Sequence, residues 1–168
     1  YPPLKSEKGV PLLTQNRQFQ WFSRPTYIFP VVPATAATML KKAGHDVLFL
    51  DGIAAELTEE AFDAQLAAFR PDLVVLETKT PVVKRHWRWI EEKVKGKKEE
   101  GRGAADSSSM CSPHPSPLTP HLSTPKFLLV GDHVTALPQE SIAKPGVWAV
   151  IPGGDWDYGL LDFIAAGC

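Results

Sequence analysis

Short apolar runs alternate with amphipathic stretches along most of this chain, and the two patterns predict different elements. An apolar run of four or five residues without internal alternation is typical of a parallel β-strand that is covered on both faces. The chain has several such runs, so it has enough apolar segments to build a buried sheet. They predict strands at residues 47–50, 73–76, 127–130 and 147–151.

Between these runs, amphipathic stretches with recognisable ends predict helices. Residues 34–43 are rich in alanine and lead to Gly44, which can take the left-handed conformation that terminates a helix. Thr58 has the side chain of an N-cap, and Glu59 and Glu60 follow it where the helix dipole favours negative charge. That helix carries an apolar stripe of Ala61, Phe62, Leu66 and Phe69, and further helices are expected at 82–94, 138–143 and 158–166.

The alternation of helices and strands predicts an α/β fold with a flavodoxin-like (Rossmann-type), doubly wound parallel sheet. In that architecture the first strand lies at the centre of the sheet. This chain shows no strand pattern before residue 34, because residues 1–30 have neither helical nor strand periodicity. We expect them to form a long ordered loop, anchored by Trp21, Phe22, Tyr27 and Phe29. The first strand of the sheet is missing from the pattern, so we interpret the chain as a fragment.

Residues 96–125 differ in composition from the rest of the chain. They are rich in Gly, Ser, Pro and Thr and show no apolar periodicity. Such a segment buries too little surface to offset the entropy of ordering, so we predict a disordered insertion. With 168 residues, the chain otherwise fits one domain that covers residues 1–168.

Composition restricts the class of protein further. The net charge of −1 gives no general attraction to nucleic acids or to anionic membranes, so we expect neither as a partner. Neither a membrane-spanning apolar stretch nor a signal peptide is present, which favours a cytoplasmic location. The chain has 2 cysteines, Cys111 and Cys168, too few for a disulfide framework or a four-thiolate metal site.

Polar and glycine-rich loops follow three of the predicted strands. Parallel strands place their carboxyl ends at one edge of a sheet, where ligands of such folds bind. Glycines there allow a close backbone approach, and threonine hydroxyls can both donate and accept hydrogen bonds. The candidate loops are Glu77-Thr78-Lys79-Thr80, Gly131-Asp132-His133-Val134-Thr135 and Gly153-Gly154-Asp155.

Several of these side chains have more than one interpretation. Lys79 could bind a phosphate or an amide carbonyl, or form a salt bridge with Glu77 or Asp132. For His133, capping of the next helix or contact with a ligand is favoured over catalysis or metal binding. Asp155 and Asp157 could share a metal ion, but two carboxylates are weak support, so a loop that caps the last helix is preferred.

The helix at 82–94 combines basic and aromatic residues at positions 84–89, which could indicate nucleic-acid contact. Glu91 and Glu92 follow at once, and helical spacing turns Trp87 and Ile90 toward the sheet. A solvated basic face is therefore the preferred interpretation.

Five motifs together resemble one family. They are Tyr-Pro-Pro at 1–3, Leu-Lys-Lys-Ala-Gly-His-Asp-Val at 40–47, Phe-Arg-Pro-Asp-Leu-Val at 69–74, Gly-Asp-His-Val-Thr-Ala-Leu-Pro at 131–138 and Gly-Gly-Asp at 153–155. In this order and spacing they are similar to the N-terminal cobalamin-binding domain of cobalamin-dependent radical SAM enzymes. The resemblance covers nearly the whole chain except the insertion.

The resemblance implies that cobalamin (vitamin B12) lies across the carboxyl edge of the sheet, with its dimethylbenzimidazole tail between strands and helices. It implies no catalytic or metal-ligating residue in this chain. The implied cofactor-binding residues are Pro2, Pro3, Glu77, Thr78, Lys79, Thr80, Gly131, Asp132, His133, Val134, Thr135, Gly153, Gly154 and Asp155.

The chain departs from related proteins in two motifs. The pattern Asp-x-His-x-x-Gly, whose histidine binds cobalt, is absent, so His133 is not expected to be a cobalt ligand. The pattern Cys-x-x-x-Cys-x-x-Cys is also absent, so the 4Fe-4S cluster and S-adenosylmethionine would belong to a catalytic domain in cis that this chain lacks. That domain would perform a methyl transfer or a related radical reaction.

Two other functions remain open at this point. The chain could be a truncated, non-catalytic remnant that binds no cofactor. It could also be a flavodoxin-like binder of a nucleotide or flavin, although the absence of Gly-x-Gly-x-x-Gly argues against a dinucleotide.

Overall fold

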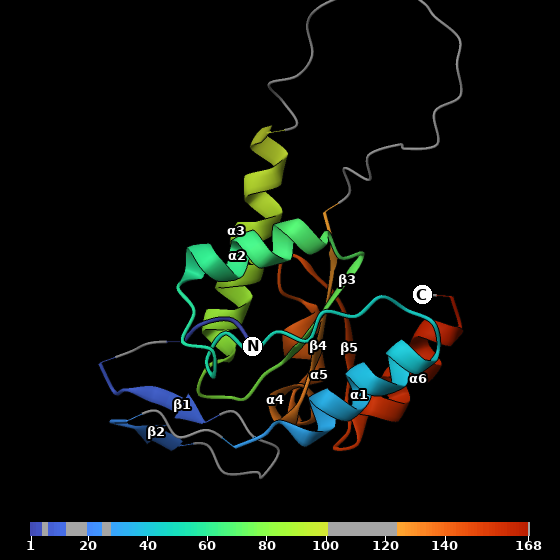
Figure 1. Ribbon diagram of the computed structural model, residues 1–168, viewed down its shortest axis with the longest axis horizontal. Coiled ribbons are helices and arrows are strands. Elements are labelled where there is room, and N and C mark those ends of the chain that lie inside the picture. The colour runs from blue at the N-terminus through green and yellow to red at the C-terminus, as the bar shows by residue number, and fades with distance from the viewer. Residues whose placement is uncertain (5–6, 13–19, 25–27, 101–123, 168) are drawn as a thin grey trace, which may run out of the picture.

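The chain forms a mixed α/β structure around a parallel sheet. The computed structural model describes residues 1–4, 7–12, 20–24, 28–100 and 124–167. Within these residues the 3-stranded sheet has the order β3-β4-β5, and an antiparallel pair, β1-β2, lies apart from it (Figure 1). The strands are β1 (Val10–Leu12), β2 (Gln20–Phe22), β3 (Leu73–Glu77), β4 (Lys126–Val130) and β5 (Val147–Ile151).

The register of the sheet brings the carboxyl ends of its strands together. Glu77 of β3 lies opposite Val130 of β4, which in turn lies opposite Ile151 of β5. The β4–β5 ladder has one irregularity, between Phe127 and Leu128. The loops that follow β3, β4 and β5 therefore leave the sheet at the same edge.

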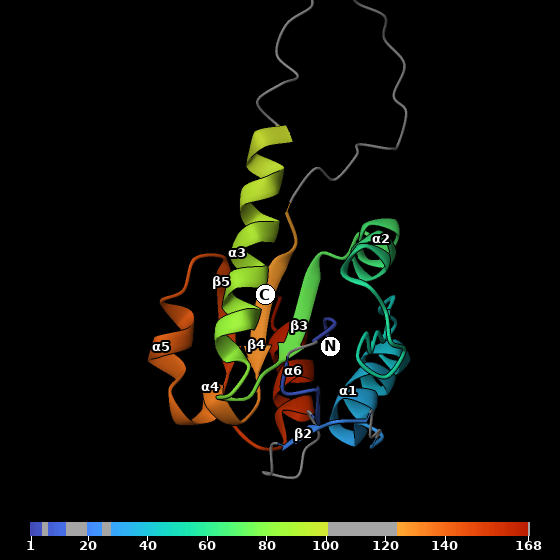
Figure 2. The same ribbon diagram turned by 90° about the vertical axis from the view of Figure 1, so that its left-hand side faces the viewer.

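Helices cover both faces of the sheet, with α3 and α5 on one side and α1 on the other (Figure 2). α2 contacts α3 through an edge-to-face pair of Phe62 with Trp89 and an ion pair of Asp63 with Lys93. The helices are α1 (Val31–Lys42), α2 (Glu59–Phe69), α3 (Val83–Glu100), α4 (Asp132–Ala136), α5 (Pro138–Ile142) and α6 (Trp156–Ala165).

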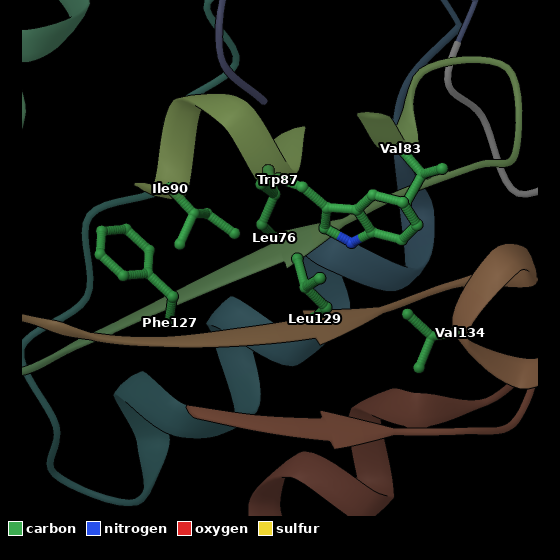
Figure 3. Close-up of a cluster of buried hydrophobic side chains, with 7 residues drawn as sticks. All are labelled: Leu76, Val83, Trp87, Ile90, Phe127, Leu129 and Val134. Atoms are coloured by element: carbon green, nitrogen blue, oxygen red, sulfur yellow. The ribbon is translucent and has the colours of Figure 1, made fainter. Parts of the chain in front are cut away.

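Alternate residues of β4 enter two separate apolar cores. Phe127 and Leu129 join Leu76 of β3, together with Val83, Trp87 and Ile90 of α3 and Val134 of α4 (Figure 3). Leu128 and Val130 pack on the opposite face, against Ala36 and Leu40 of α1 and Trp156 and Leu160 of α6. The prediction that Trp87 and Ile90 turn toward the sheet is confirmed.

Both expected helix ends are confirmed. Thr58 Oγ1 accepts a hydrogen bond from the amide of Ala61 at 3.2 Å, which satisfies one free N–H of the first turn of α2. At the end of α1, Gly44 has a φ of 93°, and the amides of Gly44 and His45 donate to the carbonyls of Lys41 and Leu40. This is the Schellman motif, in which the residue after the C-cap takes the left-handed conformation that glycine adopts most easily.

The strand predicted at residues 47–50 is wrong. These residues have no regular secondary structure, and Leu48 and Phe49 are 38% and 43% exposed. An apolar run forms a strand only where neighbouring strands satisfy its backbone groups, and none of the described strands lies beside this one.

The prediction for residues 1–30 is wrong in part, because β1 and β2 pair within this segment. Among its expected anchors, Trp21 and Phe22 are half-buried, but Phe29 is 67% exposed. Tyr27 lies outside the described residues.

The elements around the predicted insertion also differ in length. α3 continues to Glu100, so residues 96–100, expected to be disordered, are helical. Residues 101–123 of the insertion, which include Cys111, lie outside the described part of the chain, as does Cys168. The helix expected at 138–143 is confirmed as α5, whereas α4, which Leu137 separates from α5, was not expected. No helix among the described residues is long and apolar enough to cross a membrane.

Candidate ligand-binding edge of the sheet

Two side-chain contacts join the loops after β3, β4 and β5 at the carboxyl edge of the sheet. Lys79 Nζ lies 2.9 Å from Asp132 Oδ2, which links the first loop to the second. Thr135 Oγ1 accepts a hydrogen bond from the Gly153 amide at 2.9 Å, and it donates to the Gly131 carbonyl at 3.0 Å. These contacts unite the three predicted loops in one surface.

The salt bridge between Lys79 and Asp132 is one of the two interpretations that the sequence left open for Lys79. The lysine side chain is only 4% exposed, whereas that of Asp132 is 49% exposed. The ammonium group is therefore directed inward to its carboxylate, and Asp132 is the member of the pair that a ligand can reach.

A buried polar pair, Thr78 and His86, lies beneath this edge. Thr78 Oγ1 and His86 Nδ1 are 2.8 Å apart, and both side chains are almost fully buried. Burial away from water lowers the pKa of His86 to about 3, so its ring is neutral. Its Nε2 has no hydrogen-bond partner among the described residues. Thr78 is thus engaged internally, although the sequence suggested that it contacts a ligand.

His133 is also internal. Its side chain is 3% exposed, its Nδ1 lies 3.1 Å from Thr80 Oγ1, and its Nε2 lies 3.5 Å from Glu140 Oε2. The ring meets Trp87 edge to face at a centroid distance of 5.4 Å. These contacts connect the loop after β3 with α4 and α5. His133 therefore links these elements beneath the surface of the edge.

Glu77, the last residue of β3, is also buried. Burial raises the pKa of its carboxyl group, and Tyr1 Oη donates a hydrogen bond to Glu77 Oε2. Burial likewise raises the pKa of the Tyr1 phenol, which stays protonated and able to donate. Tyr1 and the buried Pro2 therefore lie close to the loop after β3, although far from it in sequence.

The three glycines of the edge have different roles. Gly131 has a φ of 103°, and a Cβ atom there would lie 2.6 Å from the Thr78 carbonyl oxygen. The close approach at Gly131 is thus to the chain itself. Gly153 has a φ of 125°, and neither Gly153 nor Gly154 has a neighbour within 4 Å of a Cβ position. The open space at the edge lies over these two residues.

The fourteen residues implied by the resemblance fall into two groups. Pro2, Glu77, Thr78, Lys79, Gly131, His133 and Val134 are buried, and Val134 belongs to the apolar core. The residues with surface that a ligand can contact are Pro3, Thr80, Asp132, Thr135, Gly153, Gly154 and Asp155.

Two carboxylates, Asp155 and Asp157, lie at the start of α6. Asp155 occupies the N-cap position of α6 without a side-chain cap bond, and Asp157 is buried. In the described part of the chain, no group of three or more His, Cys, Asp or Glu side chains is placed to hold a metal ion. The exposed groups of these loops can donate and accept hydrogen bonds, and the Thr80 hydroxyl lies 3.1 Å from His133 Nδ1.

Sequence reasoning missed two features of this region. His86 was counted with the basic face, although its spacing from Val82 and Ile90 places it on the buried stripe of α3. It also missed a cavity of about 590 Å³ beside β3, whose lining includes Tyr1, Pro2 and Glu77.

Comparison of the chain with protein-family models, curated proteins and solved structures found no match. The grounds for a functional assignment are therefore the contacts at this edge and the motifs in the sequence.

Proposed function

We propose that this chain is a cobalamin-binding domain with a flavodoxin-like fold, which holds the corrinoid against the carboxyl edge of its parallel sheet. Its partner would be a radical SAM catalytic domain in cis. The observation that supports the proposal best is that the loops after β3, β4 and β5 are joined by the Lys79–Asp132 and Thr135–Gly153 contacts. Three consecutive loops on one edge provide a broad surface of the kind that a flat macrocycle needs.

The exposed groups of this edge suit the periphery of a corrin. Its amide side chains donate and accept hydrogen bonds, and the carboxylate of Asp132 and the hydroxyl of Thr80 offer both complementary functions. The open space over Gly153 and Gly154 allows the backbone to approach a large ring closely. The edge of the sheet therefore suits the amide side chains of the corrin and the face of its ring.

The residues present do not supply a lower axial ligand to cobalt from the loop after β4. The His133 ring is buried, and its two nitrogens face Thr80 and Glu140. When bound, cobalamin would supply organometallic chemistry, and the residues of this chain would bind and orient it. The proposed role is consequently that of a carrier rather than a catalyst.

A spectroscopic titration tests this proposal. Hydroxocobalamin is added to the purified chain, and we expect saturable binding with a shift of the visible corrin bands. Gly154→Phe places a ring in the open space of the edge and should weaken binding at least tenfold. Glu92→Phe, which adds the same ring at an exposed position on α3, is the matched control and should bind as the parent does.

Other outcomes overturn the proposal. Absence of saturable binding to this chain and to a version extended before Tyr1 would favour the cofactor-free remnant. Saturable binding of flavin mononucleotide without binding of hydroxocobalamin would favour a flavin site. Equal binding by the parent and Gly154→Phe would place the corrinoid elsewhere on the chain.

A further inference from the structure

β3 is an edge strand with one satisfied side and one open side. The Lys126 amide donates to the Asp72 carbonyl, and the Thr78 amide donates to the Val130 carbonyl, each at 2.9 Å. Because backbone groups alternate between the two sides of a strand, even-numbered residues face β4. The N–H and C=O groups of Leu73, Val75 and Glu77 therefore face away from it, and no described strand pairs with them.

The cavity of about 590 Å³ extends along this open side. Its lining includes the five residues of β3 and residues 46–51. Helices α1, α2 and α6 contribute apolar side chains to the lining, among them Ala37, Leu66 and Leu160. The lining is thus largely apolar, and it includes the edge of β3 that no described strand pairs with.

Tyr1 bridges β3 and residues 46–51. Its nitrogen donates to the Leu50 carbonyl at 2.6 Å, and its carbonyl accepts from the Gly52 amide at 2.8 Å. A residue in a parallel ladder makes this pair of bonds with the residues on either side of its partner, so Tyr1 lies opposite Asp51. On the other side, the Tyr1 hydroxyl bonds to Glu77 at the end of β3.

We propose that the cavity is a binding site for an apolar β-strand that lies parallel to β3, with its carboxyl end at Tyr1. The strand would accept and donate hydrogen bonds at Leu73, Val75 and Glu77, and it would convert residues 47–50 into the next strand of the sheet. This proposal does not depend on cobalamin binding, because the groove lies beside the sheet and not across the loops.

Register and chemistry specify this occupant. If Tyr1 is opposite Asp51, the five positions before it lie opposite residues 46–50. Five extended residues span about 16 Å, which is also the length of a five-residue strand such as β3. The apolar walls select apolar side chains, and the unpaired backbone groups select a strand over a compact apolar molecule.

The test supplies such a strand directly. The five-residue sequence of β4, Lys-Phe-Leu-Leu-Val, is fused before Tyr1. We expect amide hydrogen exchange at Leu73, Val75 and Glu77 to slow at least tenfold, and the melting temperature to rise. The matched control fusion, Lys-Phe-Pro-Leu-Pro, lacks two N–H groups that this register directs toward β3, and it should leave the exchange rates as in the parent chain.

A pair of neighbouring substitutions on α1 locates the effect. Ala37 lines the cavity, whereas Thr38 is exposed on another face of the helix. In the Lys-Phe-Leu-Leu-Val fusion, Ala37→Trp should fill the groove and abolish the added protection. Thr38→Trp introduces the same ring outside the groove and should retain the protection. Circular dichroism of both variants checks that the helices form.

Four outcomes would overturn the proposal. The two fusions could protect the same amides equally, or Ala37→Trp could retain the protection. The unfused chain could also show this protection together with concentration-dependent dimerisation, in which case a second copy of the chain occupies the edge. A free benzimidazole that alone gives the same protection would identify a small-molecule pocket instead.

Discussion

β3 separates two regions built from similar apolar runs. On one side lies β4, where Phe127, Leu128, Leu129 and Val130 are each at most 1% exposed. On the other side, beyond the cavity, lies the run at 47–50, where Leu48 and Phe49 are 38% and 43% exposed. The difference teaches that hydrophobicity alone does not make a strand. β4 has a hydrogen-bonded neighbour on each side, whereas the run at 47–50 has none among the described strands.

The test with the largest expected effect replaces one phenylalanine in each region. Phe127→Ala removes a ring from the filled core around Trp89 and should lower the free energy of unfolding by about 4 kcal/mol. Phe49→Ala removes a half-exposed ring beside the cavity and should cost less than about 1 kcal/mol. Urea denaturation of both variants measures the difference, and equal losses would contradict it.

A second test compares two glycines of the carboxyl edge. Gly131 has φ 103° and ψ −172°, a region open almost only to glycine, and its Cβ position is blocked by the Thr78 carbonyl. Gly131→Ala should therefore cost about 3 kcal/mol. Gly154→Ala, where the Cβ position is open, should change stability by no more than about 0.5 kcal/mol. The thermal unfolding of each variant is the measurement, and a tolerated Gly131→Ala would argue against close packing of the β3 and β4 loops.

The closed side of β3 should also respond to pH through His86. The folded-state pKa is about 3, below the ordinary value of 6.5, so the unfolded chain takes up this proton first. The stability of the folded chain that depends on a neutral His86 is complete above pH 6.5, and it is lost as pH falls toward 3. Between pH 7 and pH 5.5 the loss should be roughly 1 kcal/mol.

The control for this pH dependence is His86→Asn, which removes the titrating ring. Glu77 acts in the opposite direction, because its raised pKa gives stability below pH 4.5 that is lost as pH rises through the folded-state pKa. Since both proteins contain Glu77, its contribution cancels when their stabilities are subtracted. Identical pH profiles of the parent and His86→Asn would rule out a buried neutral His86.

The smallest expected effect lies on the open side. In the unfused chain, Leu48→Ala should lower the free energy of unfolding by about 0.5 kcal/mol, because Leu48 is 38% exposed. In the chain with the fused Lys-Phe-Leu-Leu-Val strand, the same substitution should cost about 2 kcal/mol, since residues 47–50 would then be part of the sheet. Chemical denaturation of the four proteins gives the coupling, and equal costs in both backgrounds would show that the added strand does not order this segment.

Elements whose signals are local could be predicted from the sequence. β5 has the predicted bounds, and the N-cap at Thr58 and the left-handed Gly44 occur as expected. These depend on a few adjacent residues and their own backbone. The strand prediction at residues 47–50 was wrong because their secondary structure depends on a neighbouring strand that the pattern does not contain.

Only part of the candidate site could be predicted from the sequence. The order of elements placed the three loops on one edge, because parallel strands end together. It could not show that Thr78 and His133 turn inward, since the partners that hold them there, His86 and Trp87, come from α3. His86 itself was assigned to the solvated basic face, although its spacing from Ile90 places it on the buried stripe of α3.

The unpaired side of β3 also has a consequence for handling the protein. An exposed, apolar strand edge is a template for self-association, and natural proteins protect such edges with charges, prolines or bulges. The sequence Leu-Val-Val-Leu between Asp72 and Glu77 contains none of these devices. The chain should consequently aggregate more readily on storage or warming than its net charge of −1 alone would suggest.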